Sequence, residues 1–283
     1  MGAPSSRLVS VVWFVVLASL IAGFGAGVWT VLISSNLATT PAIPWAVVVM
    51  ALVLWLLWQY LDGRWWPRST SEARRSHLRA RPVSRSVFDW AFLAGVLSLV
   101  ALAGFWIVLV ELVGVGGNPT IPSYSQYPVV TVVLGLLMGS LVSPITEEAA
   151  FRGYGQVILE RAFPAGAAIA ISAVLFALWH GPTQGFFWSK LLFYFVVGVD
   201  FGTIAYLTRS TLPAIPVHIL GDLTFFFLIW PYDAARPLVW TAGADFWFWL
   251  FVAQMVVFTA LAILAFRRLA GVMEAARVGQ GPG

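Results

Sequence analysis

Long apolar segments dominate the chain and constrain its fold more than any other feature. A segment of about 20 mostly apolar residues is long enough to cross a bilayer as a helix. The chain is 60% hydrophobic and only 10% charged, whereas charged residues make up about 25% of an ordinary soluble domain. The sequence therefore predicts an all-α, polytopic membrane helix bundle.

About eight transmembrane helices are expected from these segments. By residue number they cover 8–33, 42–61, 87–112, 129–145, 165–180, 186–207, 212–230 and 244–266. The first is too long for the apolar core of a signal peptide, which reaches about 15 residues, so we expect it to be retained. Segment 153–163 carries Gln156, Glu160 and Arg161, and we expect it to leave the membrane or to lie in its interface.

The loop 62–86 is rich in arginine and indicates the orientation of the bundle. Its arginines are Arg64, Arg68, Arg74, Arg75, Arg79, Arg81 and Arg85. Trp65 and Trp66 stand where an aromatic belt is expected. By the positive-inside rule this loop is cytoplasmic, and both termini are cytoplasmic with it. Because the positive charge lies in loops and serves topology, we expect no nucleic-acid partner.

We expect three parts along the chain. Residues 1–125 form an N-terminal three-helix membrane region that includes loop 62–86, residues 126–268 form a second helix bundle, and residues 269–283 form a cytoplasmic tail. The expected location is the plasma membrane of a prokaryote, as an integral multi-pass protein. Cysteine is absent, which excludes a thiolate metal site and a cysteine nucleophile.

Two adjacent glutamates and an arginine interrupt the apolar sequence at 144–152, which reads PITEEAAFR. On a helix Glu148 and Arg152 are four residues apart and share a face, with the acid nearer the N-terminus, which is the favourable order. Glu147 lies about 100° away around the helix and is not the natural partner of Arg152. We therefore expect Glu148 to neutralise Arg152 and Glu147 to be the candidate general base.

Few other ionisable side chains fall inside the predicted spans. An acid at the bilayer centre costs about 2.5 to 3.5 kcal/mol on insertion scales, so each such residue needs a use or a partner. His218 and Asp222 share a helix face, as do Phe176 and His180. We expect these groups and the glutamate pair to converge on one cavity. Asp200, inside a GxxxG frame, is expected to make a structural hydrogen bond to another helix.

The predicted spans leave a discrepancy in depth. Glu147 and His218 map toward the inner side of the membrane, whereas His180 maps near the outer end of its span. A fourth or fifth span that is tilted or broken, with Pro144 and Pro182 as the causes, would remove the discrepancy. Wrong boundaries would also remove it.

Three segments carry a resemblance to a known family. EEAAFR at 147–152, FALWH at 176–180 and HILGD at 218–222 resemble the EExxxR, FxxxH and HxxxN/D motifs of the CPBP family. That family comprises the CAAX endopeptidases of prenylated proteins and the bacteriocin-processing or self-immunity membrane proteins. The resemblance covers about residues 128–228, so it implies that 126–268 is the catalytic bundle. The first ~125 residues contribute no motif.

The resemblance implies an intramembrane endopeptidase. It carries six candidate catalytic residues over to this chain: Glu147, Glu148, Arg152, His180, His218 and Asp222. Glu147 would activate water with the help of His180, and the two residues of the last motif would bind the developing oxyanion or hold a metal. The substrate would be a membrane-associated protein or peptide, prenylated in the CAAX case, cleaved in a cavity open to the cytosol.

Position 222 bears on whether a metal takes part. Many family members have Asn where this chain has Asp222, and an ionised carboxylate repels an oxyanion unless it is protonated. Asp therefore favours a metal more than Asn would, and Glu147, His180, His218 and Asp222 would be the ligands of a zinc metalloendopeptidase. The chain has no HExxH signature. We favour a mechanism that requires no cofactor, with zinc as the alternative.

Two other functions stay open at the level of sequence. A non-catalytic scaffold or self-immunity protein of the same fold would bind a membrane partner, although the intact motif residues argue against loss of chemistry. A transporter would also use buried acids and histidines as a proton relay, but we find no internal repeat. The expected partners are a protein or peptide substrate and the lipid bilayer, and the sequence leaves the oligomeric state open.

Overall fold

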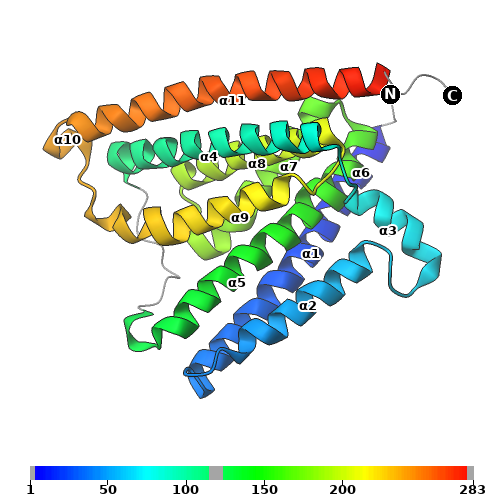
Figure 1. Ribbon diagram of the computed structural model, residues 1–283, viewed down its shortest axis with the longest axis horizontal. Helices are drawn as coiled ribbons and strands as arrows, with labels where there is room; N and C mark the ends of the chain where they lie inside the picture. The colour runs from blue at the N-terminus through cyan, green and yellow to red at the C-terminus, as the bar shows by residue number, and fades with distance from the viewer. Residues whose placement is uncertain (1–3, 115–123, 279–283) are drawn as a thin grey trace. The chain divides into compact units, whose positions relative to one another are not determined.

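The computed structural model describes residues 4–114 and 124–278, and these residues form helices and no strands (Figure 1). Seven helices in this part of the chain are long and apolar enough to cross a membrane: Ser6–Thr39, Arg85–Val113, Val129–Ala162, Ala165–Gln184, Trp188–Thr208, Ala214–Asp233 and Phe246–Ala276. An eighth apolar helix, Trp45–Leu61, has 17 residues and covers about 25 Å at 1.5 Å per residue. The all-α polytopic bundle is confirmed, and the orientation of the termini stays a prediction.

The chain divides into two compact units, each made of two separate stretches of sequence. Unit 1 comprises Met1–Ala80 and Thr120–Ser172, and unit 2 comprises Arg81–Pro119 and Ala173–Gly283. Helix α7 (Ala165–Gln184) begins in unit 1 and ends in unit 2. The predicted parts 1–125, 126–268 and 269–283 stay a prediction.

Unit 1 is built on three long helices that pack against one another. They are α1 (Pro4–Thr39), α2 (Trp45–Leu61) and α5 (Val129–Glu147). A Cβ atom added at Gly25 of α1 would lie 2.4 Å from Cγ2 of Thr146, a distance that no real side chain tolerates. Only glycine at position 25 therefore lets α1 pack this closely on the turn of α5 that leads into Glu147.

The short helix α3 (Ser71–Leu78) and the residues around it anchor two of the loop arginines inside unit 1. The guanidinium of Arg74 donates hydrogen bonds to the backbone carbonyls of Tyr60, Trp65 and Pro67, and Arg74 is only 6% exposed. It thus satisfies carbonyls that the end of α2 and the following turn leave without intrahelical partners. The sequence had assigned this arginine to membrane topology, but its buried position gives it a structural role as well.

Unit 2 is built around α4 (Arg85–Val113) and α11 (Phe246–Val278), which run side by side (Figure 1). Helices α8 (Trp188–Thr208) and α9 (Ala214–Thr224) pack on α4 and on each other. Their shared core consists of Val87, Ala91, Phe201, Ile204, Ala214, Val217 and Leu269. Because the core draws on α4, α8, α9 and α11, it fixes the position of α9, the helix that carries His218.

Polar side chains join the ends of several helices in unit 2 beyond this core. The indole of Trp106 donates a hydrogen bond to Asp233 (Nε1–Oδ2 2.9 Å), and Arg236 pairs with Glu111 (Nη1–Oε1 3.1 Å). Asp233 belongs to the 3₁₀ segment η5 (Trp230–Ala235), which precedes the one-turn helix α10 (Val239–Ala242). Glu111 is thus a paired acid at the end of α4.

Candidate functional site

All of the glutamate motif except Glu147 lies on a π-helix, η3 (Glu148–Gly155), which continues α5 and leads into α6 (Gln156–Ala162). A π-helix bonds residue i to i+5, is rare, and occurs frequently at functional sites. The sequence predicted a helix here, but it gave no signal for the π form. Pro144 does not break α5, and Pro182 does not break α7.

Neither proline therefore breaks its helix, and of the explanations for the discrepancy in depth a tilted span and wrong boundaries are left. Helix α7 continues four residues beyond His180 and ends at Gln184, so the predicted end of the fifth span at residue 180 is wrong. His180 lies inside the helix, with its backbone held by the helical hydrogen-bond ladder.

Glu148 and Arg152 form the ion pair that their spacing predicts. Nη1 of Arg152 lies 3.2 Å from Oε1 of Glu148, and both residues are 0% exposed. Charges of opposite sign compensate each other in such a setting, whereas removal of one partner leaves the other as a buried charge. The pair therefore makes each of the two residues depend on the other.

Neighbouring segments of unit 1 hold the π-helix through its backbone carbonyls. Arg79, which follows α3, donates to the carbonyl of Arg152 (3.0 Å) and also binds the carboxylate of Glu160 (2.9 and 3.1 Å). The hydroxyl of Ser172 donates to the carbonyl of Phe151 (3.0 Å). Because a π-helix is less favourable than an α-helix, such contacts from outside the helix stabilise it.

Glu147 is the last residue of α5 and directly precedes the π-helix. It is 7% exposed, in contrast to the fully buried Glu148 and Arg152. All three residues of this motif are therefore buried, and Glu147 is the least completely buried of them. The predicted separation of a structural acid from a chemical one stays a prediction.

His180 lies on α7, in the part of that helix that belongs to unit 2. Its Nδ1 is 2.8 Å from the backbone carbonyl oxygen of Phe176. A carbonyl only accepts hydrogen bonds, so this contact assigns the proton to Nδ1 and leaves Nε2 as the basic nitrogen of the neutral ring. One face of the imidazole stacks on Tyr194 of α8, with centroids 3.8 Å apart and planes 13° apart.

His218 and Asp222 lie one turn apart on α9. Nε2 of His218 is 3.7 Å from Oδ1 of Asp222, and the imidazole stacks on Phe201 with centroids 4.6 Å apart. The ring of Phe176 meets His218 edge-on at 6.1 Å and His180 at 4.7 Å. The structure thus brings both histidines of unit 2 to one phenylalanine, the first residue of the FxxxH motif.

The six candidate residues fall into two groups of three. Glu147, Glu148 and Arg152 belong to unit 1, and His180, His218 and Asp222 belong to unit 2. Within neither unit do three or more described His, Asp or Glu side chains form a group that could hold a metal ion. Roles for the six, and zinc binding by four of them, stay proposals.

Of two further residues in unit 2, Asp200 and Tyr194, the sequence predicted a role only for Asp200. Asp200 on α8 interacts with the hydroxyl of Ser98 on α4, so the predicted contact with another helix is present. Tyr194 was missed, because no motif contains it and it is 14 residues from His180 in sequence. Only the pairing of α7 with α8 brings the two rings together.

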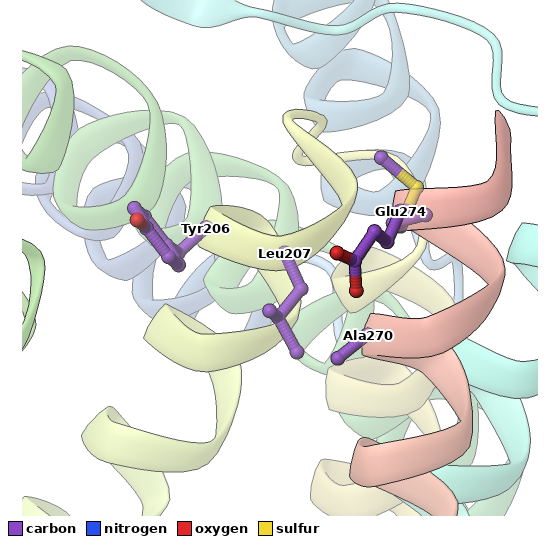
Figure 2. Close-up of a pocket in the computed structure, with 5 residues that line it drawn as sticks. Tyr206, Leu207, Ala270 and Glu274 are labelled. Atoms are coloured by element: carbon purple, nitrogen blue, oxygen red, sulfur yellow. The ribbon is translucent and has the colours of Figure 1, made fainter. Parts of the chain in front are cut away.

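A cavity of about 240 Å³ lies elsewhere in unit 2, between the ends of α8 and α11 (Figure 2). Its lining consists of Tyr206, Leu207, Ala270, Met273 and Glu274. None of the six candidate residues lines this cavity, and we assign it no part in catalysis.

Comparison with known protein families agrees with the motifs. The family described as Rce1-like, type II CAAX prenyl endopeptidase Rce1-like, matches residues 129–224. The match runs from the first residue of α5 to the last residue of α9 and includes all six candidate residues. No curated protein and no solved structure matches the chain. The family match supports the recognition of a CPBP-family intramembrane protease.

Proposed function

We propose that this CPBP-type chain is an intramembrane endopeptidase that hydrolyses a peptide bond in a membrane-associated protein or peptide. The observation that carries the proposal is that one family match, residues 129–224, includes both groups of candidate residues. Within that stretch Glu147, which is 7% exposed, stands next to a fully buried ion pair. In this proposal Glu147 activates water, whereas the acid of the buried ion pair supports the helix.

In the proposed reaction Glu147 accepts a proton from water while the water oxygen forms a bond to the peptide carbonyl carbon. The carbonyl oxygen becomes an oxyanion in a tetrahedral intermediate. The C–N bond then breaks, the departing nitrogen receives the proton, and a carboxyl group and an amine are released. General base catalysis of this kind contributes about 10²- to 10⁴-fold to a rate.

The histidine group would complete this chemistry. Nε2 of His180 is the basic nitrogen when the ring is neutral, so it would accept or relay a proton during the reaction. His218 and Asp222 would stabilise the oxyanion by hydrogen bonds, a contribution of about 2.7 to 4 kcal/mol where one such donor has been removed from other enzymes. We favour this mechanism, in which no cofactor is required.

Zinc is the alternative to the oxyanion role. The proposed ligands would be Glu147, His180, His218 and Asp222, which offer carboxylate oxygen and imidazole nitrogen, both ordinary zinc donors. When bound, zinc would polarise the peptide carbonyl and make a water molecule bound to it more acidic. In that case position 222 must stay ionised to be a ligand, whereas in the favoured mechanism it must donate a hydrogen bond.

The proposed function is tested by comparing membrane proteomes of cells that produce the wild-type protein or Glu147→Gln. The amide keeps the volume of the side chain but cannot accept the proton from water, so we expect a cleavage product to disappear. Glu274→Gln, the same change at an exposed position of α11, is the matched control and should keep the product. A peptide carrying a prenylated C-terminal CAAX sequence, and its unprenylated form, test the substrate class.

If wild type and Glu147→Gln are equally abundant in the membrane and give identical cleavage products, the proposed protease function is wrong. A cellular phenotype that persists in the double variant Glu147→Gln/His180→Ala would instead support a non-catalytic scaffold. Loss of that phenotype at unchanged abundance would count for catalysis.

A further inference from the structure

Tyr194 covers one face of the His180 imidazole. The two rings are nearly parallel, at 13°, with centroids 3.8 Å apart. Tyr194 itself is 6% exposed. A ring stacked this closely cannot turn about its bond to the β-carbon unless the tyrosine moves away, because the planes would then collide.

The other contacts of His180 leave its ring one orientation. The carbonyl of Phe176 accepts from Nδ1 at 2.8 Å, and the Phe176 ring meets the imidazole edge-on, with centroids 4.7 Å apart and planes at 64°. The carbonyl fixes the position of the proton, and the two aromatic rings fix the plane of the imidazole. The direction in which Nε2 points is therefore determined by Phe176 and Tyr194 together.

Tyr194 is held in turn by the connection between α7 and α8. Its hydroxyl donates to Oε1 of Gln184, the last residue of α7, at 2.5 Å. The ammonium of Lys190 donates to the backbone carbonyl of the same Gln184 at 2.8 Å, and Lys190 is 2% exposed. Gly185, at φ +86°, allows the chain to turn here, since other residues are strained at this angle.

We propose that Tyr194 is a positioning residue that holds the His180 imidazole, and that Gln184 and Lys190 lock Tyr194 in place. The consequence for catalysis rests on the proposed function, whereas the consequence for the imidazole does not. A displacement of about 1 Å in a catalytic group can cost about 10²-fold in rate. A tyrosine that fixes the ring plane therefore contributes to turnover without touching the substrate.

The test compares three substitutions on α8. Tyr194→Leu removes the stacked ring and should lower kcat about 10²-fold with KM within about twofold, because the loss falls on the transition state. Tyr194→Phe keeps the ring and loses only the hydroxyl, so it should recover kcat to within about tenfold of wild type. Tyr206→Leu is the matched control, since this residue lines the separate cavity of Figure 2 and lies under the guanidinium of Arg209. It should leave kcat unchanged.

A measurement on the imidazole itself keeps the inference separate from the proposed function. The chain has three histidines, so ¹⁵N-histidine labelling gives few signals, and His180→Gln assigns one of them. At an alkaline pH, where imidazole is neutral, we expect the wild type to show the Nδ1–H tautomer at His180. Tyr194→Leu should shift these signals toward a mixture of tautomers, whereas Tyr194→Phe and Tyr206→Leu should not. No substrate is needed for this experiment.

Unchanged His180 signals together with unchanged kcat in Tyr194→Leu would overturn the proposal. Shifted signals in a protein that cleaves nothing would instead support the positioning of His180 and remove the protease function. Should Tyr194→Leu fail to fold, Tyr194→Met takes its place, because the flexible thioether fills the space without a ring. The His180 signals and kcat of Tyr194→Met then test the proposal in the same way.

Discussion

The glutamate motif of unit 1 and the histidines of unit 2 are fixed in place by different interactions. Around the π-helix two ion pairs are formed, Glu148 with Arg152 and Arg79 with Glu160. Around the histidines three aromatic rings pack on the imidazoles, those of Phe176, Tyr194 and Phe201. The buried ion pairs are thus held by charge compensation, and the imidazoles are held by the packing of aromatic rings against them.

This difference has a physical basis. A carboxylate or guanidinium inside a protein requires an opposite charge or several hydrogen bonds, because desolvation of an isolated ion is very costly. A neutral imidazole carries no net charge, so its N–H donor and its acceptor nitrogen need only ordinary hydrogen bonds, and its flat faces pack against other rings. Substitutions in the first region should therefore act mainly on stability, and substitutions in the second should act mainly on the orientation of catalytic groups.

The largest effect on stability is expected for Glu148→Gln. It removes the ion-pair partner of the fully buried Arg152, and breaking a buried pair costs about 3 to 5 kcal/mol. We expect the free energy of unfolding to fall by that amount, as measured by denaturant titration in detergent micelles. The double variant Glu148→Gln/Arg152→Met should recover part of the loss. Full stability in Glu148→Gln would contradict the role of charge compensation in unit 1.

Phe176→Leu is expected to have an intermediate effect. Replacement of a buried Phe by Ala costs about 3 to 5 kcal/mol, and Leu should cost less, about 1 to 2 kcal/mol, because it fills part of the space. Since Phe176 contacts both imidazoles of unit 2, kcat should fall by more than the loss of folded protein explains.

Phe225→Leu provides the control for this comparison. Phe225 is also buried in unit 2, and its ring contacts Trp106, Phe193 and Trp230. We expect a similar loss of stability with little change in kcat per folded molecule. Equal effects of the two variants on kcat would show that the rings around the histidines act only through stability.

The smallest effect is expected for Asp222→Asn. In the favoured mechanism Asn donates a hydrogen bond to the oxyanion at every working pH, so kcat should stay within about threefold and activity should extend to higher pH. Prolonged chelation should then have no effect. The zinc mechanism predicts the reverse. The variant should have lower activity, and a chelator should inactivate the wild type until zinc is added back. The pH profile and the chelator experiment together decide between the two.

Local sequence determined a large part of this protein. The long apolar segments required membrane helices, because a bilayer leaves backbone polar groups no other partners. The spacing of Glu148 and Arg152 predicted their ion pair, since residues four apart meet on one helix face. The order of the three motifs predicted the family and the candidate residues. Each of these features depends on residues close together in the chain or on composition.

Tertiary structure alone decided the features that depend on distant residues. The π-helix of Glu148–Gly155 is held by Arg79 and Ser172, which no local pattern connects to it. The burial of Arg74 among carbonyls overrides the usual exposure of a loop arginine. The stacking of Tyr194 on His180 arises because α8 packs beside α7. Periodicity indicates which face of a helix is apolar, but only the packing of helices determines which side chain meets which.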